Sequence, residues 1–133
     1  MPLKILVIDD SLLARMAVKK CLPEDLPCEL YEATDGAQGI KLFGEHTPDI
    51  VFTDLTMPVI GGFAVLEMIR NRNPLVPVIV LSADIQKRTF EKVMELGAFR
   101  MLRKPPQKEE IRRAVTDALA SGAAGGTAGG TAP

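Results

Sequence analysis

Four apolar runs in this chain each stop at a residue with an acidic, hydroxyl or ammonium group. The runs and the residues that end them are 3–8 with Asp9 and Asp10, 50–53 with Asp54, 76–81 with Ser82, and 99–103 with Lys104. Continuous apolar runs are typical of strands covered on both faces, as in parallel sheets. If they form one parallel sheet, their polar ends share its carboxyl edge, where open α/β sheets bind ligands. Three carboxylates, a hydroxyl and an ammonium at one edge suit a divalent metal and a phosphoryl group.

Helical patterns fill the gaps between these runs. We expect strands at 3–8, 28–33, 50–54, 77–81 and 99–103, and helices directly after 10–11 and at 36–44, 62–72, 86–96 and 107–120. The second strand alternates polar and apolar residues, which favours an edge position. Alternating strands and helices predict right-handed βαβ units and therefore an α/β fold, a doubly wound five-stranded parallel sheet with helices on both faces.

Apolar spacing within the helical segments predicts the faces that pack on the sheet. The expected apolar positions are Leu13, Met16, Ala17 and Cys21 in the first helix, Phe63, Leu66 and Ile69 in the third, Phe90, Val93 and Met94 in the fourth, and Ile111, Val115 and Leu119 in the fifth. Gly97 is expected to stop the fourth helix.

The chain is long enough for one packed domain, with 133 residues of which 47% are hydrophobic. We assign residues 1–120 to this domain and the Gly/Ala/Thr-rich residues 121–133 to a flexible tail, whether native, a linker stub or an added segment. Cys21 and Cys28 show no zinc-site spacing and are expected to act as small apolar residues. No signal peptide or membrane span is evident in the sequence, which predicts a cytoplasmic protein.

Charge is distributed unevenly along the chain, although the net charge of −1 favours neither nucleic acid nor membranes. Residues 1–83 hold 7 basic against 11 acidic residues, and residues 84–133 hold 9 against 6. This pattern favours a basic partner surface in the C-terminal part. Charges that are merely scattered and solvated are the alternative.

Asp54 is the candidate nucleophile, because a carboxylate can attack phosphorus and form an aspartyl-phosphate. Asp9 and Asp10 would stand beside it, and three adjacent carboxylates repel one another unless a cation such as Mg²⁺ binds between them. The alternative is that Asp10, or Ser11 after it, only caps the first helix.

Lys104 would add a positive charge on the other side of the phosphoryl group. It is followed by Pro105, and a cis bond between the two would direct the ammonium into the crevice. Ser82 would add a hydroxyl. The structural alternatives are an ordinary surface lysine and a serine that caps the next helix.

The chain resembles the receiver domain of two-component response regulators over roughly residues 3–120. The motifs that carry the resemblance are Asp9-Asp10, Asp54-Leu55-Thr56-Met57-Pro58 with Gly62, Leu81-Ser82-Ala83, and Lys104-Pro105. The resemblance implies a flavodoxin-like strand order 2-1-3-4-5. It also implies a phosphoacceptor rather than an enzyme, with slow self-dephosphorylation at most.

Residue roles follow from the same resemblance. Asp54 would accept a phosphoryl group from the phosphohistidine of a histidine kinase or phosphotransfer protein. Mg²⁺ would be held by Asp9, Asp10, Asp54 and the backbone carbonyl of Thr56.

The remaining site residues would act on the phosphoryl group itself. Ser82 and Lys104 would contact its oxygens. Thr56 and Asp84 occupy positions where the family tunes dephosphorylation. The family's aromatic switch position holds Met101 here. Phe99, two residues earlier, is expected to point to the same face and could partly replace the missing ring.

We expect the output surface to consist of the fourth helix, fifth strand and fifth helix, docking to a protein partner without direct binding to nucleic acid or membrane. Its basic residues are Lys87, Arg88, Lys92, Arg100, Arg103, Lys108, Arg112 and Arg113. The chain would be a single-domain, chemotaxis-type regulator or a receiver taken from a longer regulator. Less favoured alternatives are a small Mg²⁺-dependent phosphohydrolase with an Asp nucleophile and a scaffold that works without phosphorylation.

Overall fold

A computed structural model describes residues 2–57 and 60–121. The strands are β1 (Leu3–Ile8), β2 (Cys28–Ala33), β3 (Ile50–Asp54), β4 (Val78–Ser82) and β5 (Arg100–Arg103). The helices are α1 (Leu12–Cys21), α2 (Gly36–His46), α3 (Gly62–Arg72), α4 (Lys87–Glu95) and α5 (Lys108–Ala120). All ten predicted elements are therefore present. Pro58 and nearly all of the predicted tail lie outside the described residues.

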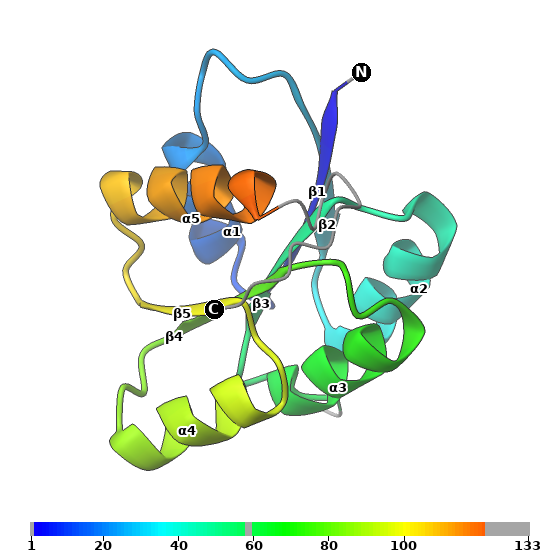
Figure 1. Cartoon of the computed structure of the whole chain (residues 1–133), viewed down its shortest axis with the longest axis vertical. Helices are drawn as coiled ribbons and strands as arrows, with labels where there is room; N and C mark the ends of the chain where they lie inside the picture. The colour runs from blue at the N-terminus through cyan, green and yellow to red at the C-terminus, as the bar shows by residue number, and fades with distance from the viewer. Residues whose placement is uncertain (1, 58–59, 122–133) are drawn as a thin grey trace.

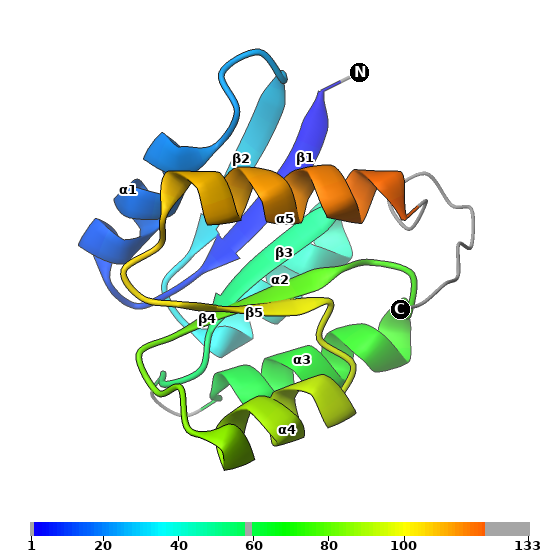
Figure 2. The same ribbon diagram turned by 60° about the vertical axis from the view of Figure 1, so that its left-hand side comes forward.

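All strand pairings are parallel, and the strand order is β2-β1-β3-β4-β5. This confirms the predicted doubly wound sheet and the edge position of β2. Figure 1 shows the strands fanning out between two layers of helices, and Figure 2 shows α5 on one side of the sheet with α3 and α4 on the other.

The bounds of β1, β2, β3 and α3 are those predicted, and the other bounds differ by at most two residues. The α2 helix continues past Gly44 to His46, and β4 extends through Ser82. Gly97 follows α4 with a φ of +98° and donates its N–H to the carbonyl of Met94, so the predicted stop is confirmed. A residue with a Cβ is strained at such a φ, which explains the glycine.

Two apolar layers, one on each face of the sheet, hold the fold together. The layer beneath α1 and α5 is formed around Val18, Phe52 and Ile111, and the layer beneath α2, α3 and α4 around Phe43, Leu66 and Val93. The three central strands are buried along most of their length, as expected when helices cover both faces.

The predicted apolar face of α1 is wrong at Leu13 and Met16, although Cys21 packs on the core as expected. Leu13 is 76% exposed and Met16 is 39% exposed, whereas Val18 is 1% exposed. The helix has apolar residues on more than one face, and packing against α5 and the sheet selects the face of Val18. In α4, likewise, only Val93 is fully buried, while Phe90 and Met94 remain exposed.

Cys21 and Cys28 are free and half-buried, in agreement with their predicted role as small apolar residues. Across residues 2–57 and 60–121, no helix has both the length and the apolar character that crossing a membrane requires.

Candidate functional site

The polar ends of four strands meet at the carboxyl edge of the sheet. The pairing registers set Ile8 of β1 beside Thr53 of β3, Asp54 beside Leu81 of β4, and Ser82 beside Arg103 of β5. The residues that end these runs therefore lie on neighbouring strands. Parallel pairing alone achieves this, because it brings every strand end to the same side.

The three predicted acids form one cluster. Asp9, Asp10 and Asp54 each offer a carboxylate oxygen, and these oxygens all lie within 4.8 Å of one another. Asp9 and Asp54 are 3% and 7% exposed, while Asp10 is exposed to solvent. Clustered carboxylates open to solvent on one side suit a hard divalent cation that retains waters.

Lys104 joins two of these acids. Its Nζ lies 2.8 Å from Oδ2 of Asp9 and 3.0 Å from Oδ1 of Asp54. The Lys104–Pro105 peptide bond is cis, as the sequence allowed. An ammonium held by two carboxylates is not an ordinary surface lysine, so the alternative interpretation of this residue is wrong.

Charge and burial perturb this pair of carboxylate and ammonium groups. Burial raises the pKa of Asp54, and the nearby Asp9 carboxylate raises it further against the opposing effect of Lys104. For Lys104, burial lowers the pKa, but its contacts with Asp9 and Asp54 outweigh this and raise the pKa overall. The ammonium is therefore firmly charged, and the acid beside it resists ionisation, as expected where negative charges are crowded.

Ser82 lies at the end of β4 and is 3% exposed. Its hydroxyl oxygen accepts a hydrogen bond of 3.0 Å from the backbone N–H of Asp84, while Gln86 is the N-cap residue of α4. The interpretation of Ser82 as a helix cap is therefore wrong. Thr56 is exposed in the loop that follows Asp54.

Gly62 allows the chain to close tightly behind Asp54. A Cβ at this position would lie 2.2 Å from the carbonyl oxygen of Asp54, so a larger residue would push β3 and α3 apart. The N–H of Gly62 also donates to the carbonyl of Leu55 at 2.9 Å. The glycine thus fixes the backbone that presents the central carboxylate.

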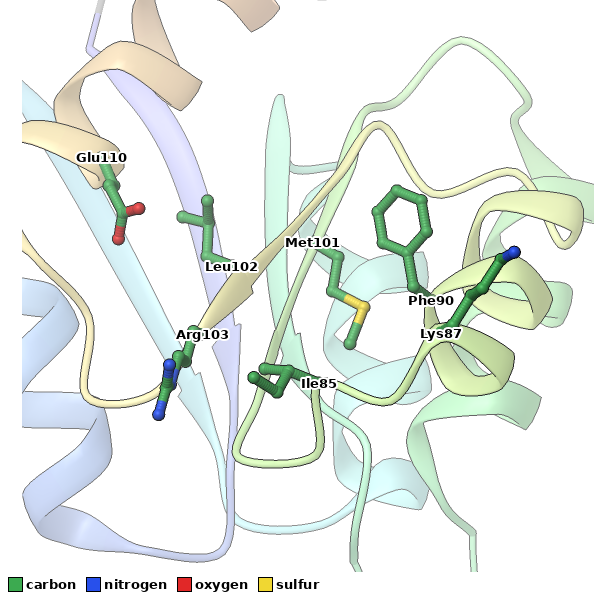
Figure 3. Close-up of a pocket in the computed structure, with 7 residues that line it drawn as sticks. All are labelled: Ile85, Lys87, Phe90, Met101, Leu102, Arg103 and Glu110. Carbon is green, nitrogen blue, oxygen red and sulfur yellow. The ribbon is translucent and has the colours of Figure 1, made fainter.

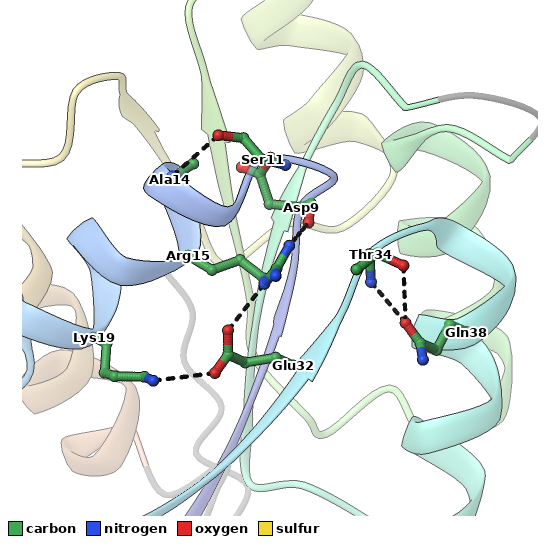
Figure 4. A network of polar contacts seen from close by, with 8 residues as sticks. All are labelled: Asp9, Ser11, Ala14, Arg15, Lys19, Glu32, Thr34 and Gln38. Carbon is green, nitrogen blue, oxygen red and sulfur yellow. Dashed lines mark hydrogen bonds and ion pairs between the residues drawn. The ribbon is translucent and has the colours of Figure 1, made fainter.

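Sequence reasoning missed a polar network behind the cluster. Arg15 of α1 donates to the backbone carbonyl of Asp9 and to the carboxylate of Glu32, which Lys19 also contacts (Figure 4). The only hint of this network in the sequence is the spacing of Arg15 and Lys19, four residues apart on the helix that follows the acid pair. Without the strand pairing, the position of Glu32 gave no reason to link them.

The position of the missing aromatic switch is occupied by Met101, which is half-buried and packs on the α2–α3–α4 layer. Phe99 packs on the opposite layer, beneath α5, so the prediction that it lies on the same face is wrong. Strict alternation holds only within β5, which begins at Arg100. Phe99 is stacked by Arg100, which itself pairs with Asp117 of α5.

Comparison with known proteins agrees with this geometry. The family model described as "Response regulator receiver domain" matches residues 5–116. The chemotaxis protein CheY of Bacillus subtilis (strain 168) is 31% identical over 116 residues, which cover 87% of this chain and 97% of that protein. The protein-glutamate methylesterase/protein-glutamine glutaminase 2 of Koribacter versatilis is 39% identical over 109 residues, which cover 80% of this chain but 30% of that protein.

A solved structure shows the same arrangement of elements. The response regulator receiver domain protein from Clostridium thermocellum superposes with a TM-score of 0.77 at 28% identity, covering 89% of this chain and 94% of that one. Sequence, strand order and clustered acids agree, and the chain belongs to the receiver domain family of two-component response regulators, a family of phosphorylation-dependent signalling modules.

Proposed function

We propose that Asp54 is the residue that becomes phosphorylated. The observation that carries this proposal is the meeting of three carboxylates within 4.8 Å, with the Lys104 ammonium 3.0 Å from Asp54. Asp54 ends the central strand β3, and the Lys104 ammonium contacts both Asp54 and Asp9. A group placed there is surrounded by the charges that phosphoryl transfer requires.

The acid cluster fits a magnesium ion. Asp9, Asp10 and Asp54 supply carboxylate oxygens, and the backbone carbonyl of Thr56 in the adjoining loop would complete the protein ligands. Hard cations select such oxygen donors, and Mg²⁺ commonly keeps several waters. When bound, the ion would supply positive charge to the phosphoryl oxygens.

In the transfer step, a carboxylate oxygen of Asp54 attacks phosphorus. The bond from phosphorus to the donor's imidazole nitrogen breaks, a new P–O bond forms, and the nitrogen keeps the electron pair. Lys104 neutralises charge on the phosphoryl oxygens. Ser82 uses its oxygen to accept from Asp84, which leaves its proton for a phosphoryl oxygen.

The donor in this proposal is a histidine kinase or a phosphotransfer protein, and the chain would meet it in the cytoplasm. Thr56 and Asp84 are both exposed in the loops that follow β3 and β4, and they would border the route by which water reaches the acyl phosphate. Their side chains would set the rate of self-dephosphorylation, so the protein returns to its resting state without a true enzymatic turnover.

The output surface in this proposal is formed by α4, β5 and α5. A pocket of about 400 Å³ opens there (Figure 3). It is lined by apolar Ile85, Phe90, Met101 and Leu102 and by charged Lys87, Arg103 and Glu110. Ile85 and Phe90 are exposed, and apolar side chains with charged neighbours are suited to a protein partner rather than to a nucleic acid.

Residues 1–120 form the receiver unit in this proposal, and residues 121–133 form its tail. The match to nearly the full length of CheY supports a CheY-like module that docks to its target. The match to 30% of the methylesterase supports the alternative, a receiver that belongs to a longer regulator.

Labelling with acetyl phosphate and Mg²⁺ tests the assignment of Asp54. The wild type should gain one phosphoryl group by intact mass, and Asp54→Asn should gain none, because an amide is a poor nucleophile. Asp25→Asn is the matched control, since Asp25 is exposed in the loop before β2, at the other edge of the sheet. Labelling of Asp54→Asn at the wild-type level would refute the assignment, and steady release of phosphate from a generic ester would favour a phosphohydrolase.

A further inference from the structure

Arg15 connects the acid cluster to the edge of the sheet. Its side chain is 11% exposed although it carries a permanent charge. Nη1 donates to the backbone carbonyl of Asp9 at 2.8 Å, and Nε donates to Oε1 of Glu32 at 2.9 Å (Figure 4). A guanidinium is well suited to this task, because its planar fork presents several donors in fixed directions.

The carbonyl that Arg15 holds belongs to the peptide that joins Asp9 to Asp10. A peptide unit is planar, so fixing its oxygen also fixes the direction of the Asp10 N–H and the position of the Asp10 Cα. Asp10 is the exposed member of the acid cluster. Its placement therefore depends on the backbone more than on packing.

Asp9 itself is held at several other atoms. Its N–H donates to Ala33 at 3.0 Å, its Oδ1 accepts from the N–H of Ser11 at 3.0 Å, and its Oδ2 accepts from Lys104 at 2.8 Å. The carbonyl is the remaining polar group of this residue, and Arg15 is its partner. The whole residue is thus oriented by contacts from β2, α1 and the end of β5.

Glu32 anchors the guanidinium. Its second oxygen contacts Nζ of Lys19 at 3.1 Å, one turn further along α1. Hydrogen bonds from Arg15, and then from Lys19, lower the pKa of Glu32, so its carboxylate stays ionised at neutral pH. Lys19 is half exposed and touches Glu32 without touching the acid pair.

We propose that Arg15 is a positioning residue for the divalent cation, because it orients the Asp9–Asp10 peptide and so holds the carboxylates of Asp9 and Asp10 at the spacing that binds the ion. This inference rests on the proposed magnesium site. Glu32 supports Arg15 from the edge strand. Residues that orient metal ligands from behind typically change metal affinity about 10–100-fold when they are lost.

The test measures Mn²⁺ binding, by the free-ion signal in electron paramagnetic resonance, in the wild type and in Arg15→Met, Arg15→Lys and Lys19→Met. Mn²⁺ accepts the same oxygen ligands as Mg²⁺. Thermal melts run in parallel, and binding is measured at a temperature where every variant is folded. Lys19→Met is the matched control, since it removes a cation from Glu32 and leaves the Asp9 carbonyl held.

Arg15→Met should weaken Mn²⁺ binding about tenfold, and Lys19→Met should stay within about twofold of the wild type. Arg15→Lys keeps the charge but not the fork, and should weaken binding about threefold or more. If Arg15→Met does not fold, the Mn²⁺ affinity of Arg15→Lys tests the role of Arg15. A lower melting temperature with unchanged Mn²⁺ affinity in both Arg15 variants would overturn the inference, since it shows a purely structural role.

The same data separate this inference from the proposed function. A wild type that fails to bind Mn²⁺ contradicts the metal site itself. A wild type that binds Mn²⁺ as tightly as both Arg15 variants leaves the site standing and refutes only the role of Arg15.

Discussion

The carboxyl edge of the sheet and the outer face of α4 are held in very different ways. At the edge, Asp9 and Asp54 are 3% and 7% exposed and share an ammonium between them. On α4, Phe90 is 47% exposed and Met94 is 37% exposed, and Val93 is the helix's buried residue. Charge pairs between buried groups hold the first region, whereas one fully buried side chain anchors the second.

This difference suits a signalling domain. Elements with few buried contacts change conformation at low free-energy cost, whereas locked sites keep their geometry. One hydrogen-bonded chain joins the two regions, since Ser82 accepts from the N–H of Asp84 and the Asp84 carboxylate accepts from Gln86 and Thr89 at the start of α4. Ser82 is therefore the residue of this chain that is closest in sequence to the strand ends of the site, and Thr89 is the residue that reaches into α4.

The largest effect is expected from Lys104→Met. The variant leaves two carboxylates facing each other without their cation, and should bind beryllofluoride at least about tenfold more weakly and unfold more easily by about 2 kcal/mol. This is below the about 3–5 kcal/mol of a fully buried broken pair, because the lysine side chain is 23% exposed. Urea unfolding measures the change in the free energy of unfolding, and fluorine NMR measures the binding of beryllofluoride.

Lys108→Met provides the comparison, because Lys108 is an exposed lysine of α5. Its free energy of unfolding should stay within about 0.5 kcal/mol of the wild type. Equal losses in the two variants would mean that the ammonium at the edge is no more important to the fold than one on the surface.

A change of pH should have a smaller effect on the free energy of unfolding, because Lys104 partly offsets the rise in pKa that burial causes at Asp54. Burial raises the pKa of Asp54 above its usual 3.8, so between the two values the folded state binds more protons than the unfolded state. The contribution of this group to stability is then present below 3.8 and is lost as pH rises through the folded pKa. Asp54→Asn should be more stable than the wild type at neutral pH.

Urea unfolding of both proteins between about pH 4 and pH 7 measures this difference. The gap between Asp54→Asn and the wild type should narrow toward the acid end. A stability difference that stays constant with pH would show that ionisation of Asp54 does not destabilise the fold. The contrast with α4 would then depend on packing alone.

The smallest effect on stability is expected from Phe90→Ala. Phe90 is exposed and should change the free energy of unfolding by about 0.5 kcal/mol or less. Val93→Ala, three residues along the same helix and fully buried, should cost about 2 kcal/mol. Phe90→Ala should also weaken binding to the proposed protein partner of the output surface. Amide chemical shifts over residues 84–120 measure this binding. Labelling by acetyl phosphate should be retained. A large loss of stability in Phe90→Ala would mean that α4 is packed as tightly as the edge.

The sequence alone was enough to predict the strands, their polar ends and the family. Continuous apolar runs, glycine stops and motif order are local properties, and parallel pairing follows from strand–helix alternation. It predicted Asp9, Asp10, Asp54 and Lys104 as one group for the same reason. The spacing of Leu13 and Met16 did not reveal their exposure, because an apolar stripe shows a face but not the neighbour that covers it.

What the sequence determined, then, is which chemical groups end each strand, since residue type and order are all that the sheet edge requires. Only the tertiary structure decided which of those groups touch. The contacts of Lys104 with Asp9 and of Arg15 with Glu32 join residues 95 and 17 positions apart. The tertiary structure also decided that Phe99 and Met101 lie on opposite faces of the sheet. All of these contacts depend on how distant elements pack and not on a local period in the sequence.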